Sequence, residues 1–274
     1  MEKTPSVILE AGRADRQYWH DLWRYRELFV FLAWRDLSVR YKQTAVGVAW
    51  ALVRPFITMV VFSLFGALTN TDTGGAPRAI MTFTAILPWT LFSSAMSESA
   101  GSLLGNSNLI SKVYFPRLIL PATSLMVCLV DFLISLGFLG VLMVWYQYWP
   151  TWRVLTLPLF TLSALLSSIA VGLWMASLTV KYRDFRVVVP FILQFGTFVS
   201  PIAFLSSIIP EKWRLLYSLN PMVGVIDGFR WAVLGQSVEF YWPGLILSVL
   251  LSIGLLWTGI WYFRRTEKTF ADVI

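Results

Sequence analysis

Three charged residues lie in or beside long apolar stretches, and they are the first candidates for chemistry. Arg54 precedes Pro55 near one end of such a stretch, and its guanidinium is suited to bidentate hydrogen bonds with phosphate. The alternative is that Arg54 snorkels to the phosphates of membrane lipid. Asp131 lies about ten residues, or roughly 15 Å, into another stretch, where a carboxyl group is either protonated or paired with a polar group. Glu98 ends a third stretch and is compatible with simple solvation.

Other reactive side chains are scarce. The one cysteine, Cys128, lies in an apolar run and is expected to be a buried packing residue. The one histidine, His20, argues against a His-based metal site and against a Ser-His-Asp triad. No GxxxxGK[ST] motif occurs, so we expect no P-loop for ATP. We therefore expect no catalytic site, no metal and no cofactor bound by this chain.

The elements that position these residues are transmembrane helices. Of the 274 residues, 57% are hydrophobic and only 14% are charged, whereas soluble domains carry about 25% charged residues. A transmembrane helix needs about 20 apolar residues. We predict an all-α integral membrane protein with six spans, at 46–68, 79–97, 121–146, 154–180, 187–209 and 242–263. Residues 1–45 and 264–274 flank this domain, and the first 27 residues lack the apolar core of a signal peptide.

The basic residues indicate the topology. Most Lys and Arg fall in the segments 1–42, 98–120, 181–186 and 264–274, which an even number of spans places on one side. The positive-inside rule assigns that side, and both termini, to the cytoplasm. Because topology accounts for the net charge of +7, we expect no binding to nucleic acid.

Three other segments are neither spans nor plain loops. Residues 23–42 combine aromatics with charges and predict a helix lying at the cytoplasmic interface, with its aromatics at headgroup depth and its Arg residues reaching phosphates; a plain solubilising tail is the alternative.

In the connection 98–121, small and polar residues are expected to end the second span. A short amphipathic helix, Leu109 to Phe115, then presents an apolar face to a partner before Pro116 stops it; that face comprises Leu109, Ile110, Val113 and Tyr114. Residues 211–241 predict two short external re-entrant or interfacial helices separated by Asn220-Pro221.

Four stretches together resemble a known family. They are WRDLSVRYKQTAVGVAWALVRP (34–55), NLISKVYFPRLILP (108–121), KYRDFR (181–186) and the SLNPM…GFR segment (218–230). In this order and spacing they look like the membrane subunits of ABC-2-type exporters. More narrowly, they resemble the permeases that export O-antigen, capsular polysaccharide or teichoic acid. The likeness begins at about residue 28, and residues 1–22 remain without an assigned role.

The resemblance implies three functional segments. An amphipathic interface helix would include Trp23, Arg24, Phe31, Trp34, Arg35 and Arg40. A coupling helix fitting a groove on an ATPase subunit would comprise Asn108, Leu109, Ile110, Lys112, Val113, Tyr114, Phe115, Pro116 and Arg117. External gate helices would include Asn220, Pro221 and Arg230.

It also implies partners and a location. These would be a second copy of the chain, two ABC ATPase subunits that use ATP and Mg²⁺, membrane lipid, and an undecaprenyl-pyrophosphate-linked polysaccharide whose pyrophosphate Arg54 could hold. The location would be the bacterial inner membrane.

Aromatic side chains could line the path of a glycan, because the C–H faces of sugars pack on aromatic rings in weak, replaceable contacts. Phe191, Phe195 and Phe198 share one helical face, while Trp50, Phe62 and Phe65 are weaker candidates that do not. The alternative is that these rings face lipid or a neighbouring helix.

Three other functions remain open. A proton- or sodium-coupled flippase would depend on Asp131 alone, and a membrane glycosyltransferase would need paired acids that the scattered external carboxylates do not provide. An ABC-2 exporter of drugs or lipids is the nearest rival because it shares the architecture.

Overall fold

The computed structural model describes residues 14–42, 49–68, 75–235 and 240–270, and these residues include no strand. Five helices among them are long and apolar enough to cross a membrane: α3 (Ala49–Leu68), α4 (Arg78–Gly105), α6 (Ile119–Trp145), α7 (Leu157–Lys181) and α11 (Trp242–Glu267). A 3₁₀ turn, η1 (Trp152–Thr156), directly precedes α7. Five predicted spans are thus confirmed as helices, and the chain is a multi-pass membrane protein.

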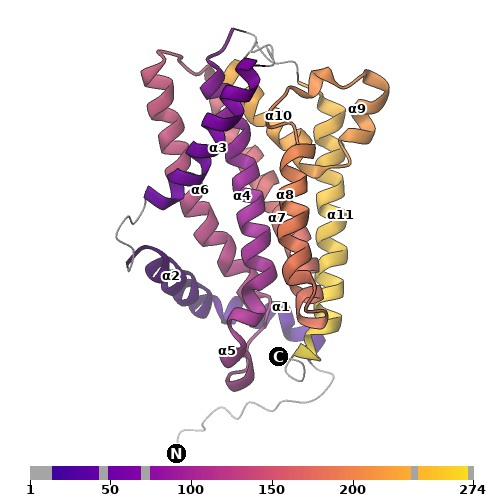
Figure 1. Cartoon of the computed structure of the whole chain (residues 1–274). Coiled ribbons are helices and arrows are strands. Elements are labelled where there is room, and N and C mark those ends of the chain that lie inside the picture. The colour runs from indigo at the N-terminus through magenta and orange to yellow at the C-terminus, as the bar shows by residue number, and fades with distance from the viewer. Residues whose placement is uncertain (1–13, 43–48, 69–74, 236–239, 271–274) are drawn as a thin grey trace, which may run out of the picture.

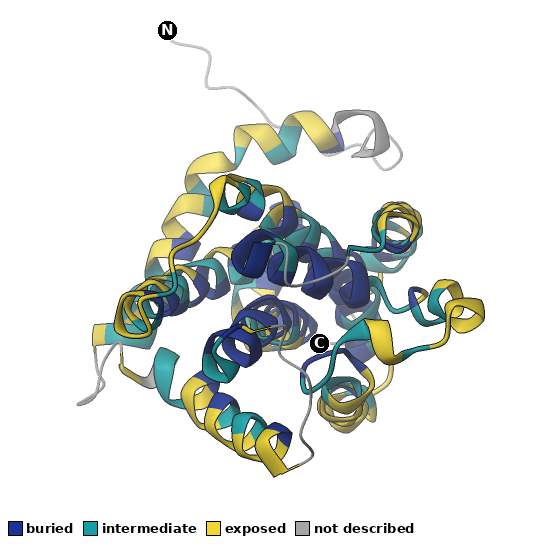
Figure 2. Ribbon diagram, turned by 90° about the horizontal axis from the view of Figure 1, so that it is seen from above, coloured by how far each residue is buried: buried dark blue, intermediate teal, exposed yellow. Residues whose placement is uncertain are grey.

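Helix α4 is the centre of the bundle and packs against α3, α6, α7 and α10 (Pro221–Leu234). Buried helices occupy the middle and half-exposed ones surround them, as Figure 2 shows from above. Small residues allow this close packing, as is usual between membrane helices. A Cβ on Gly172 of α7 would lie only 2.9 Å from Ser99 Cβ of α4, and the Ser167 and Ser252 hydroxyls join α7 to α11 at 2.7 Å.

The fifth predicted span, 187–209, is wrong as a continuous helix. Helix α8 (Phe185–Val199) has 15 residues, about 22 Å of rise, which is short of the roughly 30 Å hydrocarbon core. Pro201 disfavours helical dihedrals at Ser200, and residues 200–210 are irregular apart from η2 (Ser206–Ile208). The chain then reaches α9 (Glu211–Tyr217), at the opposite end of the bundle from α5 (Ser107–Lys112) (Figure 1). We call these two ends the α9 end and the α5 end.

Three helices end at other residues than the predicted ends. Helix α4 continues through Gly101 to Gly105 instead of ending near residue 97, since its last turns remain packed in the bundle. Helix α5 ends at Lys112, three residues before the predicted Phe115, and Val113 is extended (φ −131°, ψ 135°). Helix α11 runs past the predicted end at 263 to Glu267.

The predicted interface helix is two helices, α1 (Ala14–Arg24) and α2 (Arg26–Lys42), separated at Tyr25. Helix α1 lies largely in the segment that had no assigned role. Its Tyr18 is buried in a second apolar cluster at the α5 end, together with Ile110, Phe115, Phe263 and Phe270. The described ends of the chain therefore meet beside α5.

Candidate functional site

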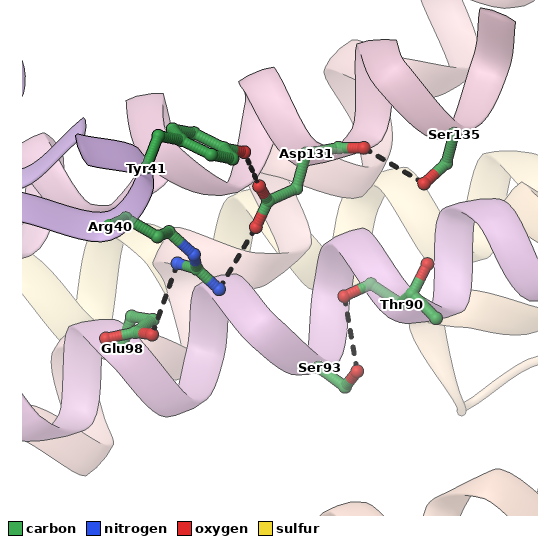
Figure 3. A network of polar contacts seen from close by, with 7 residues as sticks. All are labelled: Arg40, Tyr41, Thr90, Ser93, Glu98, Asp131 and Ser135. Carbon is green, nitrogen blue, oxygen red and sulfur yellow. Dashed lines mark hydrogen bonds and ion pairs between the residues drawn. The ribbon is translucent and has the colours of Figure 1, made fainter. Parts of the chain in front are cut away.

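A network of charged and hydroxyl groups joins the interface helix α2 to two spans (Figure 3). Arg40 Nη2 lies 3.0 Å from Asp131 Oδ2 on α6, and Arg40 Nη1 lies 3.5 Å from Glu98 Oε1 on α4. The Tyr41 hydroxyl donates to the other carboxylate oxygen of Asp131. Asp131 is thus paired, as one of the two alternatives above predicted. Glu98 is half-exposed and also within reach of Arg40.

Tyr41 is held in its protonated form. Burial raises the pKa of its phenol, and the hydrogen bond to Asp131 and the charge of that carboxylate raise it further. Tyr41 therefore remains a donor at neutral pH. Together with Arg40 it satisfies both oxygens of a carboxylate that would be costly to leave alone inside a span.

Arg35 makes a second link between α2 and the bundle. Its Nη2 donates to Asn106 Oδ1 (2.8 Å), and Asn106 is the C-cap of α4. A guanidinium at this position also complements the negative end of the helix dipole. Polar groups of the chain itself thus engage both Arg35 and Arg40, and the contact of the interface arginines with lipid phosphates stays a prediction.

The remaining interface residues are exposed. Trp23, Phe31 and Trp34 are each at least 64% exposed, and Arg24 is exposed as well. Aromatic side chains of this kind gather at the level of lipid headgroups.

The network opens into a cavity of about 640 Å³ lined by α3, α4, α6 and α8. Its charged lining residues are Arg40, Arg54, Glu98 and Asp131. Hydroxyl groups supply most of its other polar lining, and these belong to Thr58, Thr90, Ser93, Ser94, Ser97, Ser135 and Thr197. Such a lining can donate to and accept from a polyhydroxylated chain without binding any one group tightly.

The hydroxyl groups of α4 that line the cavity were not predicted from the sequence. Thr90, Ser94 and Ser97 follow one another at i, i+4 and i+7, so they share a helical face. A hydroxyl stripe inside an otherwise apolar span was the signal that could have identified them. Tyr41 was missed too, since nothing local distinguishes it from the other aromatics of the interface segment.

The structure separates the aromatic conduit candidates. Phe191, Phe195 and Phe198 lie on one exposed face of α8, each more than 60% accessible, and Phe198 also borders the cavity. Phe65 is exposed on α3, whereas Phe62 packs against the core. The side chain of Trp50 lies outside the described residues.

Helix α8 is held beside the cavity by Trp89 of α4. The indole Nε1 donates to Thr197 Oγ1 at 2.9 Å, and a Cβ on Gly196 would lie 2.7 Å from the Trp89 ring. Arg54 and Gln194 line the same cavity from α3 and α8. Within the described part of the chain, no ion pair or side-chain hydrogen bond engages the Arg54 guanidinium.

The coupling segment presents a smaller apolar surface than predicted. Ile110 and Phe115 are buried in the cluster at the α5 end, so the expectation that Ile110 faces a partner is wrong. Val113 and Tyr114 are 49% and 58% exposed. Asn108 and Lys112 are exposed, Leu109 is half-buried and Pro116 is buried.

Arg117 ties the coupling segment to the last span. Its backbone N–H donates to Glu267 Oε1 (2.8 Å), and its guanidinium donates to the Glu267 carbonyl. A displacement of Val113 and Tyr114 would therefore be transmitted to the end of α11.

The segment at the α9 end consists of two helices, with Asn220 and Pro221 at their junction, as predicted. The Asn220 side chain accepts from the Met222 N–H and donates to Ser200 Oγ (3.0 Å). Arg230 of α10 is fully buried and donates to the carbonyls of Ile202 (2.8 Å) and Phe204 (2.7 Å). These bonds hold the irregular segment that follows α8.

Comparison with known proteins gives consistent matches. Residues 27–234 match the family described as ABC-2 type transporter. The chain is 30% identical over 257 residues to the O-antigen export system permease protein RfbA of Myxococcus xanthus, covering 93% of this chain and 98% of that protein. It is 24% identical to an RfbA of Klebsiella pneumoniae (90% and 95% covered) and 23% identical to the polysialic acid transport protein KpsM of Escherichia coli (81% and 88%).

The Arg40–Asp131 pair can be tested by a double-mutant cycle. Asp131→Asn and Arg40→Gln should each lower the melting temperature of the purified protein, and the double variant should lose less than the sum of the two. A coupling of about 1 kcal/mol would correspond to roughly 2–4 °C. Lys42→Gln, which alters an exposed cation on the same helix, is the matched control and should not couple to Asp131. Strict additivity for Arg40 and Asp131 would contradict the pairing.

Proposed function

Because the chain belongs to the ABC-2 type transporter family, we propose that it is the membrane subunit of an ATP-driven polysaccharide exporter. The cargo is a lipid-linked polysaccharide, moved from the cytoplasmic to the outer side of a bacterial inner membrane. Full-length similarity to O-antigen export permeases favours O-antigen as the cargo. The polysialic acid transport relatives favour a capsular polysaccharide as the second candidate.

The position of the cavity is the single observation that carries the proposal. It lies on a hydroxyl-bearing face of α4 between α3 and α8, two helices whose outer faces are apolar and exposed. A polar, partly exposed surface of this kind is unfavourable against hydrocarbon. A second copy of the chain, docked through α3 and α8, would bring two such cavities together and exclude lipid from them. The result is a polar conduit suited to a glycan.

Two groups then act on the cargo. Arg54 faces the cavity and would bind the pyrophosphate of the lipid carrier through charge-assisted hydrogen bonds. The exposed stripe of Phe191, Phe195 and Phe198 would offer aromatic surfaces along which the sugars slide. Hydroxyl groups of α4 keep the sugar hydroxyls solvated without holding them in place.

The driving force would enter at the α5 end, which we assign to the cytoplasm together with both termini. Two ATPase subunits would contact Val113 and Tyr114, the exposed apolar part of the coupling segment. Movement there would reach α11 through Arg117 and reach α2 and α4 through the buried cluster at the α5 end. The same segment would thereby shift α4, which lines the conduit.

A strain lacking this gene tests the function itself. Lipid-linked polysaccharide should accumulate inside the cell and the surface glycan should disappear, because the carrier is loaded but not moved. Mass spectrometry of the lipid extract measures the intermediate and identifies the glycan, with the complemented strain as control. Normal surface glycan and no intermediate would contradict polysaccharide export and favour an exporter of drugs or lipids.

A charged residue at the coupling surface should uncouple the two subunits. Val113→Glu or Tyr114→Glu would bury a carboxylate against the ATPase, so copurification of the ATPase and export should both be lost. Tyr114→Phe keeps the ring and serves as the matched control, with assembly retained. Undiminished export by both glutamate variants would overturn the coupling assignment.

Removal of the phenylalanine stripe should slow export without loss of assembly. The triple variant Phe191→Ala, Phe195→Ala, Phe198→Ala removes the proposed sliding surface but leaves the coupling segment intact. A control with Val188, Ile192 and Val199 changed to alanine removes exposed apolar groups from a neighbouring face of α8. Pulse-labelled appearance of surface glycan is the measurement. Equal rates in the two triple variants would assign the phenylalanines to lipid contact.

A further inference from the structure

A second cavity, of about 470 Å³, lies at the α9 end and is separate from the cavity beside α8. It lies between α9, the turn η2, the start of α11 and one face of α10. Its lining residues are Ser206, Ser207, Glu211, Arg214, Tyr217, Ser218, Val223, Asp227, Phe240 and Tyr241. The volume is within the range of about 300–1,000 Å³ typical of small-molecule sites.

Asp227 gives this cavity an unmet hydrogen-bonding requirement. Asp227 is only 4% exposed. The Ser206 hydroxyl, which also lines the cavity, hydrogen-bonds to its carboxyl group, whereas Oδ1 has no hydrogen-bond partner among the described residues. The neighbouring Arg230 donates from both terminal nitrogens to the carbonyls of Ile202 and Phe204, and its buried Nε makes no hydrogen bond with the described residues, so Arg230 provides charge but no donor to Oδ1. A buried carboxylate oxygen without a donor is costly, so a ligand that supplies an O–H or N–H group is favoured here.

Aromatic rings form the apolar part of the wall, and their positions are fixed. The Tyr217 hydroxyl donates to the Val199 carbonyl at 2.7 Å, which leaves its ring at the cavity. Tyr241 packs on Gly244, where a Cβ would lie 2.7 Å from the Tyr241 ring, and Phe240 stacks edge-on with Trp242. Rigid rings beside a carboxylate provide both an apolar face and an acceptor.

The lining discriminates among ligand classes. Asp227 and Glu211 disfavour phosphate and other anions, since two carboxylates line the cavity. No group of three or more His, Cys, Asp or Glu suited to a metal ion occurs among the residues that the structure describes, and Arg214 adds a positive charge to this wall. A neutral sugar ring satisfies both features, because its hydroxyls donate to carboxylates and its C–H face packs on aromatic rings.

We propose that this cavity binds a saccharide unit of the exported chain as it leaves the conduit. The inference rests on the proposed function, which makes the α9 end the outer one. Binding there would retain the emerging glycan between cycles of ATP hydrolysis and oppose its movement back into the conduit. The cavity walls include both helices that meet at Asn220-Pro221, so an occupying sugar would also bridge α9 and α10.

The experiment uses an exposed residue of the cavity as a reporter in whole cells. Ser207→Cys, in a Cys128→Ser background, is labelled with a membrane-impermeant maleimide in the assembled transporter. Labelling is compared between cells that make the glycan and cells whose glycan synthesis is stopped at its first step. Ile208→Cys is the matched control, since Ile208 is 63% exposed next to Ser207 but does not line the cavity.

Glycan synthesis should slow the labelling of Ser207→Cys and leave that of Ile208→Cys unchanged. If the effective concentration of the tethered glycan at the cavity is about ten times its dissociation constant, labelling of Ser207→Cys would be slowed about tenfold. Adding Tyr241→Ala or Asp227→Asn should abolish the protection. Equal labelling rates with and without glycan, in cells that export normally, would overturn the saccharide site alone. No labelling of either cysteine from outside would instead contradict the outward assignment of the α9 end, and with it the proposed direction of transport.

Discussion

The structure depends on the satisfaction of backbone polar groups that a bilayer cannot hydrate. Helix α8 ends after Val199, and the irregular segment that follows would otherwise leave carbonyls without donors close to the hydrocarbon. Arg230 solves this problem by donating to Ile202 and Phe204 from a fully buried position. The segment is thereby fixed, and with it the end of the phenylalanine stripe and the walls of both cavities.

A second constraint acts on charges at the edge of the bundle. Asp131 is tolerated in α6 because Arg40 and Tyr41 approach it from α2, and Arg35 caps the end of α4 from the same helix. Helix α2 is therefore joined to the bundle by these polar contacts and also by Leu32, which is buried in the cluster at the α5 end, while its Phe31 and Trp34 remain exposed.

Continuous apolar runs were sufficient to predict five spans, because hydrocarbon thickness allows little choice of helix length. Residues 200–209 misled the prediction, since their apolar character resembles a span while Pro201 ends the helix before them. The end of α4 was placed too early because Gly101 and Gly105 look like helix breakers, yet packing overrides propensity there. The contact between Arg40 and Asp131 spans 91 positions, and no local pattern in one sequence identifies such a partner.

Among the candidate site residues, those with a local sequence signature could be predicted. Asn220-Pro221 predicted the junction of α9 and α10 because proline disfavours a helical residue before it. The burial of Ile110 could not be foreseen, since the apolar cluster that contains it includes Tyr18 of α1, a segment with no recognised pattern.

The meeting of Tyr18, Ile110, Phe263 and Phe270 has a consequence for biosynthesis. Helices α1 and α5 and the end of α11 all contribute side chains to this one apolar cluster. A growing chain cannot close that cluster until Phe263 and Phe270 have been made, so the neighbouring Val113 and Tyr114 acquire their native support late. A chain truncated before Phe263 would lack the rings of both Phe263 and Phe270 and would leave the apolar side chains of α1 and α5 less well buried.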